Sequence, residues 1–132
     1  MEATKQFRKR NAILDCLRGT DQHPSAEWIY RSLKQDFPDL SLGTVYRNLS
    51  RFREQGLIVS LGTVNGAERF DGDIAPHIHY VCTRCGCVRD LPGITPEGKW
   101  LRAVESAAGG SMEGYRLLFY GKCEECNILA KN

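Results

Sequence analysis

Two cysteine pairs constrain this chain more than any other feature of its sequence. Cys82 and Cys85 form one C-x-x-C pair, Cys123 and Cys126 form a second, and 37 residues lie between the pairs. Four thiolates in two such pairs are the usual ligands of a tetrahedral zinc ion. In a reducing cytosol, cysteines are metal ligands or redox groups more often than disulfides. The spacing therefore predicts a structural zinc site that ties the end of a C-terminal domain to its first strands.

The thiols also allow other interpretations. A C-x-x-C pair can be a thiol–disulfide redox motif, but no thioredoxin-like βαβ pattern surrounds either pair, so zinc is favoured. Cys16 falls on an apolar helix and is expected in the core. Cys87 lies beside the first pair and is either an inert neighbour or an oxidation-sensitive thiol. We favour the inert neighbour.

Charge and hydropathy limit where the protein works. The chain has 132 residues, with 18 Lys and Arg against 16 Asp and Glu. No apolar run approaches the ~18 residues of a membrane helix, and the basic start has no apolar signal core. We therefore expect a cytoplasmic protein with no membrane partner. Residues 1–55 carry ten basic and seven acidic side chains. This excess of positive charge fits either a region that contacts phosphates or a solvated helix start, and charge alone favours the solvated helix start.

Helical periodicity dominates the N-terminal half. Apolar residues recur at helical spacing over residues 7–17. Ser25 is the expected N-cap of a second helix that runs to Phe37 and is closed by Pro38. Ser41 is the expected N-cap of a third helix over residues 42–55, whose exposed face carries an aromatic ring and guanidinium groups.

A β-hairpin follows the three helices. Residues 57–61 and 67–71 predict strands joined by a tight turn at Asn65-Gly66. Three short helices and a hairpin indicate a winged helix-turn-helix, whose third helix enters the DNA major groove. An Arg on that helix can grip guanine, and a Tyr ring can pack on a thymine methyl.

The remaining sequence predicts a second domain and an α+β fold class. Residues 1–71 form the expected winged-helix domain, and residues 72–76 the expected hinge. Residues 77–132 form the expected α/β dimerisation domain with the four-cysteine zinc site. Within it we expect a strand pair around residues 82–91, a helix over 95–108 and a strand over 115–120.

Several motifs resemble those of the ferric uptake regulator family, in the same order and over nearly the whole chain. They are HPSAEWIY at 23–30, SLGTVYRNL at 41–49, RFD at 69–71, HIH at 77–79 and the two cysteine pairs. The resemblance implies a homodimeric, metal-dependent repressor that binds a double-stranded DNA operator and is not an enzyme.

The same resemblance implies three sets of functional residues. The structural zinc ligands are the four paired cysteines. The DNA contacts are Ser41, Thr44, Tyr46 and Arg47 on the recognition helix, with Arg8 and Arg10 from the N-terminal region. The regulatory metal ligands are His23, Asp71, His77, His79 and Asp90. Residues at i and i+2 on a strand point to one face, so His77 and His79 can converge on one ion.

The regulatory ligand set predicts the metal and the signal. Three imidazoles and two carboxylates without a thiolate fit Fe²⁺ or Mn²⁺ better than a dedicated zinc sensor. The aspartates at positions 71 and 90 resemble the peroxide-responsive branch of the family, which senses hydrogen peroxide by iron-catalysed oxidation of a ligand histidine. The matching positions here are His23 and His77. The alternatives are an iron- or manganese-responsive uptake regulator and, less favoured, a metalloenzyme.

Overall fold

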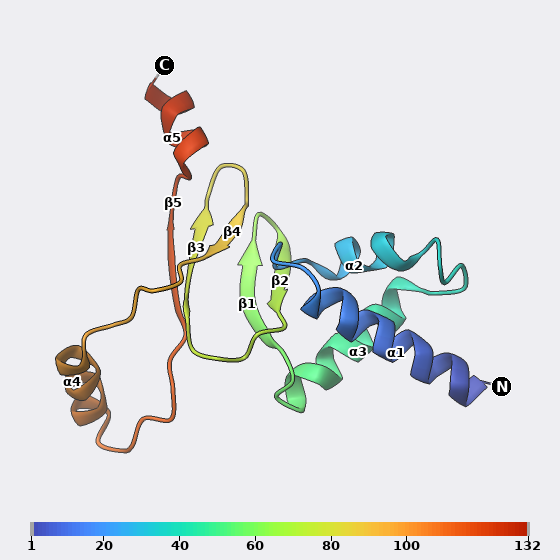
Figure 1. Cartoon of the computed structure of the whole chain (residues 1–132), viewed down its shortest axis with the longest axis horizontal. Helices are drawn as coiled ribbons and strands as arrows, with labels where there is room; N and C mark the ends of the chain where they lie inside the picture. Colours follow the sequence, from blue (N-terminus) through green and yellow to red (C-terminus); the bar gives the residue numbers. More distant parts are fainter. Residues whose placement is uncertain (1, 132) are drawn as a thin grey trace. The chain divides into compact units, whose positions relative to one another are not determined.

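The chain folds into two compact units. The structure is a computed structural model that describes residues 2–131, and its units are Met1–Ile74 and Ala75–Asn132 (Figure 1). The division falls within residues 72–76, the predicted hinge, while the predicted outer bounds 1 and 132 lie outside the described residues. Helices and strands occur in both units, which confirms the α+β class. Within residues 2–131, no helix has the length and apolar character needed to cross a membrane.

Three helices form the body of the N-terminal unit: α1 (Glu2–Arg18), α2 (Ala26–Leu33) and α3 (Leu42–Glu54). The expected caps are present, since the Ser25 hydroxyl accepts from the Trp28 amide and the Ser41 hydroxyl accepts from the Thr44 amide. The helices bury one apolar core, which includes Ile13, Leu17, Ile29, Val45, Leu49 and Phe52.

The second helix is shorter than predicted. It ends at Leu33 rather than at Phe37, and the chain continues through a turn in which the Phe37 amide donates to the Leu33 carbonyl. The residue before a proline is disfavoured in the helical conformation, so Pro38 keeps Phe37 out of the helix, and residues 34–36 form a turn.

A two-stranded antiparallel hairpin, β1 (Val59–Val64) and β2 (Ala67–Asp71), completes this unit. Asn65 and Gly66 have φ values of 52° and 85°, as a two-residue type I′ turn requires. The first strand begins at Val59 rather than at Leu57, because the Leu57 amide donates to the Phe52 carbonyl and closes α3. The strand then continues beyond its predicted end.

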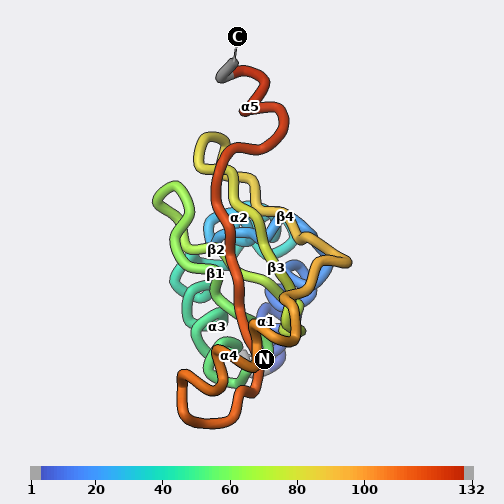
Figure 2. The backbone as a smooth tube through the Cα atoms, turned by 90° about the vertical axis from the view of Figure 1, so that its left-hand side faces the viewer, coloured from blue at the N-terminus to red at the C-terminus, as the bar shows by residue number. Residues whose placement is uncertain are grey.

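The C-terminal unit is built on a three-stranded sheet in the order β4-β3-β5. β3 (Ile78–Cys82) pairs antiparallel with β4 (Val88–Asp90) and parallel with β5 (Leu117–Gly121). The parallel pairing needs a crossover, which contains α4 (Gly98–Ala108). Figure 2 follows the chain from α4 through β5 into α5.

The last helix, α5 (Glu124–Lys131), was not predicted from the sequence. Its signal is weak because it has only eight residues, although two acidic residues mark its start. The core of this unit is small and includes several cysteines: its buried side chains are Ile78, Val81, Cys82, Val88, Cys123 and Cys126, with His79. None of the described residues of α4 is buried.

Candidate metal centres and nucleic-acid interface

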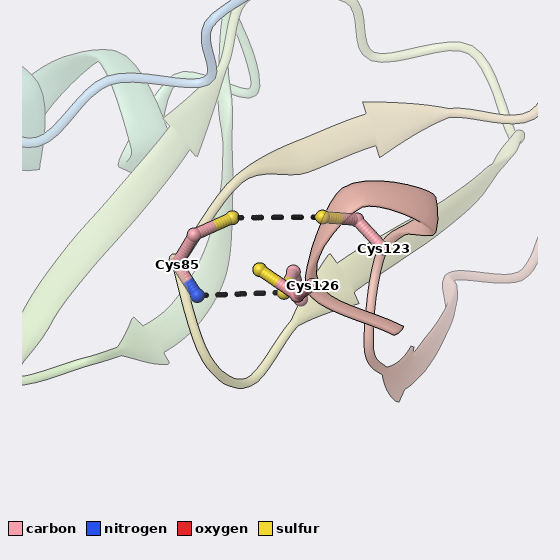
Figure 3. Close-up of side chains that lie close together, drawn as sticks. Cys85, Cys123 and Cys126 are labelled. Atoms are coloured by element: carbon pink, nitrogen blue, oxygen red, sulfur yellow. Dashed lines mark hydrogen bonds between the residues drawn. The ribbon is translucent and has the colours of Figure 1, made fainter. Parts of the chain in front are cut away.

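The four paired cysteines converge in the C-terminal unit. Cys82 is the last residue of β3. Cys85 lies in the following turn, Cys123 directly precedes α5, and Cys126 lies in its first turn (Figure 3). Their sulfur atoms all lie within 4.8 Å of one another. The Cys85 and Cys123 sulfurs are 3.9 Å apart, close to the ~3.8 Å edge of a tetrahedron with Zn–S bonds of ~2.3 Å.

The backbone of the cluster favours ionised sulfurs. A hydrogen bond from the Cys85 amide, with others, lowers the pKa of Cys82 to about 5, and the Cys126 amide lowers the pKa of Cys123. Conversely, hydrogen bonding to Cys123 raises the pKa of Cys126 to about 12, because the Cys126 thiol holds its proton against a neighbouring thiolate. Four sulfurs this close can all be ionised only around a cation, so the donor set fits zinc.

The fifth cysteine of this region, Cys87, differs from the tetrad. It packs against the cluster, and burial raises the pKa of its thiol to about 11. Its carbonyl accepts a hydrogen bond from the Cys82 amide. A protonated thiol is a poor nucleophile, and Cys87 is not among the four cysteines whose sulfurs converge, which supports the inert-neighbour interpretation.

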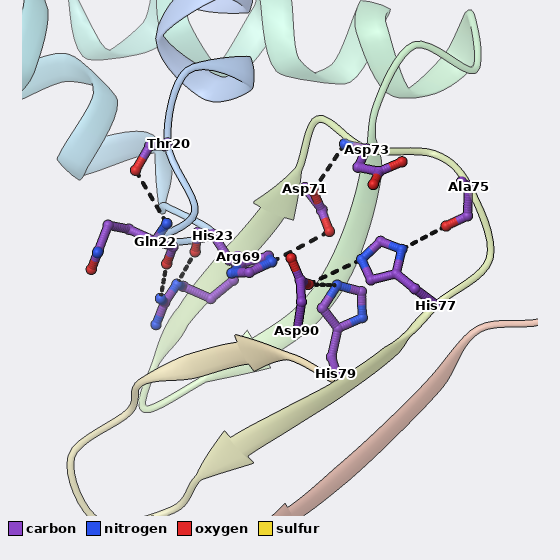
Figure 4. A network of polar contacts seen from close by, with 10 residues as sticks. All are labelled: Thr20, Gln22, His23, Arg69, Asp71, Asp73, Ala75, His77, His79 and Asp90. Atoms are coloured by element: carbon purple, nitrogen blue, oxygen red, sulfur yellow. Dashed lines mark hydrogen bonds and ion pairs between the residues drawn. The ribbon is translucent and has the colours of Figure 1, made fainter. Parts of the chain in front are cut away.

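Two of the predicted regulatory ligands, His23 and Asp71, form a buried pair in the N-terminal unit. The His23 Nε2 and Asp71 Oδ2 atoms are 3.4 Å apart, and the side chains are 3% and 10% exposed. His23 has a left-handed backbone, with φ of 50°. Arg69 holds this turn, since its guanidinium donates to the Gln22 carbonyl at 2.6 Å and to the His23 carbonyl (Figure 4).

The other three ligands, His77, His79 and Asp90, cluster in the C-terminal unit. Their elements explain the proximity: His79 and Asp90 are direct partners across β3 and β4, and His77 precedes β3 by one residue. The Nε2 atoms of His77 and His79 lie 3.0 and 3.2 Å from the Asp90 Oδ1 (Figure 4). Neighbouring ligand atoms of an octahedral site with ~2.1 Å bonds are ~3.0 Å apart, so the spacing matches such a site.

The tautomer of His77 is fixed by the backbone. Its Nδ1 lies 2.6 Å from the Ala75 carbonyl oxygen, which can only accept, so Nδ1 carries the proton. In the neutral ring the lone pair is then on Nε2, the nitrogen that faces Asp90. A metal-binding histidine is usually oriented in this way by a hydrogen bond from its other nitrogen.

The five predicted regulatory ligands thus belong to two subsets, a pair in the N-terminal unit and a triad in the C-terminal unit. Each subset has the nitrogen and oxygen donors that Fe²⁺ and Mn²⁺ accept, and neither contains a thiol. That one ion joins the two subsets stays a prediction.

The predicted DNA contacts on α3 are linked to one another and to α2. The Ser41 and Thr44 hydroxyls are 2.9 Å apart, and the Arg47 guanidinium donates to the Thr44 hydroxyl at 3.1 Å. The Tyr46 hydroxyl donates to the Glu27 carboxylate at 2.6 Å. These bonds preorganise the exposed polar face of the helix.

The two N-terminal arginines pack on aromatic rings. The Arg8 guanidinium lies 5.9 Å from the centre of the Phe37 ring, and that of Arg10 lies 5.1 Å from the centre of the Phe52 ring. Arg10 is half-buried and Arg8 is exposed. Their contact with DNA stays a prediction.

Sequence reasoning missed two side chains that organise these sites. Arg69 belongs to the RFD motif and Glu27 to the HPSAEWIY motif, but the sequence predicted no role for either side chain. Their partners lie 46 and 19 residues away, and hydrogen bonds over such distances leave no periodic signal in a sequence.

Comparison with known proteins agrees with this arrangement. A model of the ferric uptake regulator family matches residues 2–105. The peroxide operon regulator of Bacillus subtilis is 39% identical over 121 residues, which are 90% of this chain and 81% of that protein. The peroxide-responsive repressor PerR of Staphylococcus aureus is 33% identical over 119 residues, covering 89% and 79%.

The fold comparison leads to the same group of proteins. The crystal structure of the Campylobacter jejuni peroxide stress regulator has a TM-score of 0.77 and 30% sequence identity, and covers 95% of this chain and 93% of its own. The resemblance inferred from the motifs is confirmed, and the metalloenzyme alternative is excluded because the family consists of transcription regulators. This chain belongs to the ferric uptake regulator family.

Proposed function

We propose that this protein is a homodimeric, metal-dependent DNA-binding repressor that senses hydrogen peroxide. The observation that carries the proposal is the thiol-free triad of His77, His79 and Asp90, spaced like the edges of an octahedral site. The names of the two similar sequences and of the similar Campylobacter structure, all peroxide regulators, support the choice of signal.

We assign the two metals by donor chemistry. Cys82, Cys85, Cys123 and Cys126 would hold a structural zinc ion, because four thiolates complete a closed tetrahedron. His23 and Asp71 with the triad would hold Fe²⁺ or Mn²⁺, because imidazoles and carboxylates without sulfur suit these ions. Two carboxylates offset the divalent charge, and five ligands leave one position of an octahedron open.

The division of the regulatory ligands between two units gives the metal a mechanical role. A single ion held by ligands from both units would select one arrangement of them across residues 72–76. In a dimer, that selection would set the separation of two recognition helices to about one DNA turn, ~34–36 Å, or a multiple of it. A change from mostly open to mostly closed needs a ~10⁴-fold preference of the ion for the closed state.

Peroxide would reverse this selection by modifying a ligand. Ferrous iron held by these residues would supply the redox chemistry that cleaves the peroxide O–O bond, and it would undergo no net change. One peroxide oxygen would be added to an imidazole carbon of His23 or His77, and the two electrons lost by that carbon would reduce the other oxygen to water. Overall, one peroxide and one imidazole C–H give one water and one oxygenated imidazole. An oxidised ring is a weaker ligand, so the ion is lost and the operator is released.

The homodimer is supported by the exposed edge of the C-terminal sheet. β5 is an outer strand of its sheet, and its residues Phe119 and Tyr120 are 52% and 75% exposed. An exposed apolar edge strand invites pairing with another chain. A DNA-binding repressor with this surface would work in the cytoplasm, where its operator lies.

The peroxide proposal is tested by mass spectrometry of the iron-loaded protein. The zinc-containing protein is loaded with Fe²⁺ without oxygen, treated with about one equivalent of peroxide and digested. We expect one added oxygen on the peptide containing His23 or His77, together with loss of operator binding. The Mn²⁺-loaded protein is the matched control and should stay unmodified and bound to DNA.

The same experiment distinguishes peroxide sensing from the alternative function. If the iron-loaded protein binds DNA, gains no oxygen and stays bound after peroxide, the peroxide assignment is wrong. The chain would then be an iron- or manganese-responsive uptake regulator, whose DNA binding follows metal concentration alone.

A further inference from the structure

We infer that Glu27 is a positioning residue for base recognition: it holds Tyr46 so that the recognition helix reads a thymine methyl group rather than a hydrogen-bond acceptor of a base. The inference rests on the proposed DNA binding by α3. Its starting point is the 2.6 Å hydrogen bond from the Tyr46 hydroxyl to the Glu27 Oε1, which joins two helices.

Both ends of this bond lie on rigid parts of the N-terminal unit. Glu27 is in the first turn of α2, between Ala26, which is buried, and Trp28, whose amide is bonded to the Ser25 cap. Tyr46 follows Val45, whose side chain is fully buried in the core. The hydrogen bond therefore fixes the ring of an exposed tyrosine against a firm partner. Without it, a side chain that is 42% exposed has several rotamers available.

The direction of the bond is set by charge. The hydrogen bond to Tyr46 is the largest cause of the lowered pKa of Glu27, and the same bond is the largest cause of the raised pKa of Tyr46. At neutral pH the carboxylate is therefore ionised and the phenol is neutral, so the phenol is the donor. Bonds of this charge-assisted kind are stronger than those between neutral groups.

The bond determines what Tyr46 can offer to DNA. Its one hydroxyl proton is already used, so Tyr46 cannot donate to a base, and its ring carbons are the part left for apolar contact. In the major groove, the apolar feature of a base edge is the C5-methyl group of thymine. The neighbouring carboxylate also repels phosphates, which favours an approach to a base edge over an approach to the backbone.

Arg47, the next residue along the helix, offers the hydrogen-bond donors that Tyr46 does not. Arg47 donates to the Thr44 hydroxyl at 3.1 Å and keeps further donors available for a guanine or a phosphate. The helix thus presents a hydrogen-bonding side chain next to a ring held for apolar contact. Hydrogen-bond recognition belongs to Arg47 and methyl recognition to Tyr46.

The test uses DNA that differs by single methyl groups. A duplex is first selected from randomised DNA with the Mn²⁺-loaded wild-type protein. Each thymine of a half-site is then replaced by deoxyuridine, which removes only the methyl. Burial of one methyl is worth ~0.8 kcal/mol, so we expect one thymine per half-site at which the change weakens wild-type binding about fourfold.

Four variants assign this penalty to the Glu27–Tyr46 bond. Glu27→Ala should weaken binding to the thymine duplex and abolish the deoxyuridine penalty, whereas Glu27→Gln, which keeps an acceptor oxygen, should retain it. Tyr46→Phe should behave like Glu27→Ala, and combining the two should add nothing further. The control variant Glu54→Ala also removes one negative charge, from α3 rather than from α2, and so measures the general effect of charge on DNA affinity.

The outcomes separate the inference from the function on which it rests. If Glu27→Ala keeps the full penalty, or if wild-type binding is insensitive to every thymine methyl, the inference is wrong although DNA binding stands. If the wild-type protein selects no duplex in the presence of Mn²⁺, the proposed function fails, and the inference with it. Zinc content and circular dichroism of each variant verify that it is folded.

Discussion

At the scale of single residues, Arg69 decides where a predicted metal ligand lies. His23 has a φ of 50°, in the left-handed region that residues other than glycine seldom adopt. Such a conformation costs ~1–3 kcal/mol and persists only where the surroundings impose it. Arg69 on β2 supplies that constraint by donating to two successive carbonyls, those of Gln22 and His23.

Removing this side chain should damage the regulatory site selectively. We expect Arg69→Met to weaken Mn²⁺ binding about tenfold or more, as the loss of a group that orients a ligand typically does. Zinc content should not change. Arg89→Met, which removes an exposed arginine from β4, is the matched control and should bind Mn²⁺ normally. Isothermal titration of the zinc-containing proteins would measure this, and equal Mn²⁺ affinity in both variants would show that Arg69 does not position His23.

The predictability of single residues depended on their chemistry. The four cysteines were predicted to converge because thiols at C-x-x-C spacing have few other uses, and they do. His77 and His79 were predicted to point to one face, and their rings lie 4.2 Å apart. Glu27 and Arg69 are common surface residue types, so nothing in the sequence marked their hydrogen bonds.

At the scale of elements, a close contact joins two strands of the C-terminal sheet. β5 runs parallel to β3, and Gly121 lies against Tyr80, whose hydroxyl donates to the Lys122 carbonyl at 3.1 Å. A Cβ atom at position 121 would overlap the Tyr80 hydroxyl. The glycine is therefore required by packing against its neighbouring strand.

This contact predicts a pair of coupled stability changes. Gly121→Ala should lower the free energy of unfolding by ~1–2 kcal/mol, because the Tyr80 ring must move and lose its hydrogen bond. In a Tyr80→Phe background the same change should cost much less, since the nearest remaining ring atom lies at 3.4 Å, an ordinary contact. Urea unfolding of the four zinc-loaded proteins gives the double-mutant cycle. Additive effects would mean that the overlap is relieved elsewhere.

Elements were predicted well where a cap or a turn marked them. The starts of α2 and α3 and the turn at Asn65-Gly66 follow local rules that act within a few residues. The end of α2 was wrong because the influence of Pro38 on Phe37 outweighed an apolar pattern. The short α5 was missed because eight residues give little periodic signal in a sequence.

At the scale of the whole molecule, the two units differ in what stabilises them. The N-terminal unit buries a continuous apolar core contributed by three helices and the hairpin. The C-terminal unit buries few apolar side chains, and three of its buried residues are cysteines of the tetrad. Zinc should therefore supply much of the stability of the second unit and little of that of the first.

Zinc removal should unfold one unit and spare the other. After chelation under reducing conditions, we expect rapid amide hydrogen exchange in β3, β5 and α5, with protection retained in α1 and α3. Hydrogen exchange followed by mass spectrometry resolves the two units. Cys85→Ser should reproduce the effect of the chelator, whereas Cys87→Ser should keep zinc and full protection. Equal loss of protection in both units would contradict separate sources of stability.

Assembly is a second property of the whole molecule. The exposed Phe119 on the outer strand β5 is the most direct place to disturb a dimer. We expect Phe119→Lys to shift the protein from dimer to monomer in sedimentation equilibrium, because a charge would then enter an apolar interface. It should also abolish tight binding to a palindromic duplex, while Lys99→Ala, an exposed change on α4, should leave both properties intact. A wild-type protein that sediments as a monomer would exclude the proposed dimer.

The parallel pairing of β3 with β5 also affects the order in which parts of the chain fold. The hairpin of the N-terminal unit closes over a two-residue turn, whereas β3 must wait for a strand that lies beyond the whole of α4. Contacts between distant segments form late, so a newly synthesised chain should complete its helices first and its zinc tetrad last. During that interval its thiols are open to oxidation and its sheet edges to aggregation. Oxidants and zinc shortage should therefore deplete the youngest molecules first, whereas mature protein, with its tetrad closed, should outlast them.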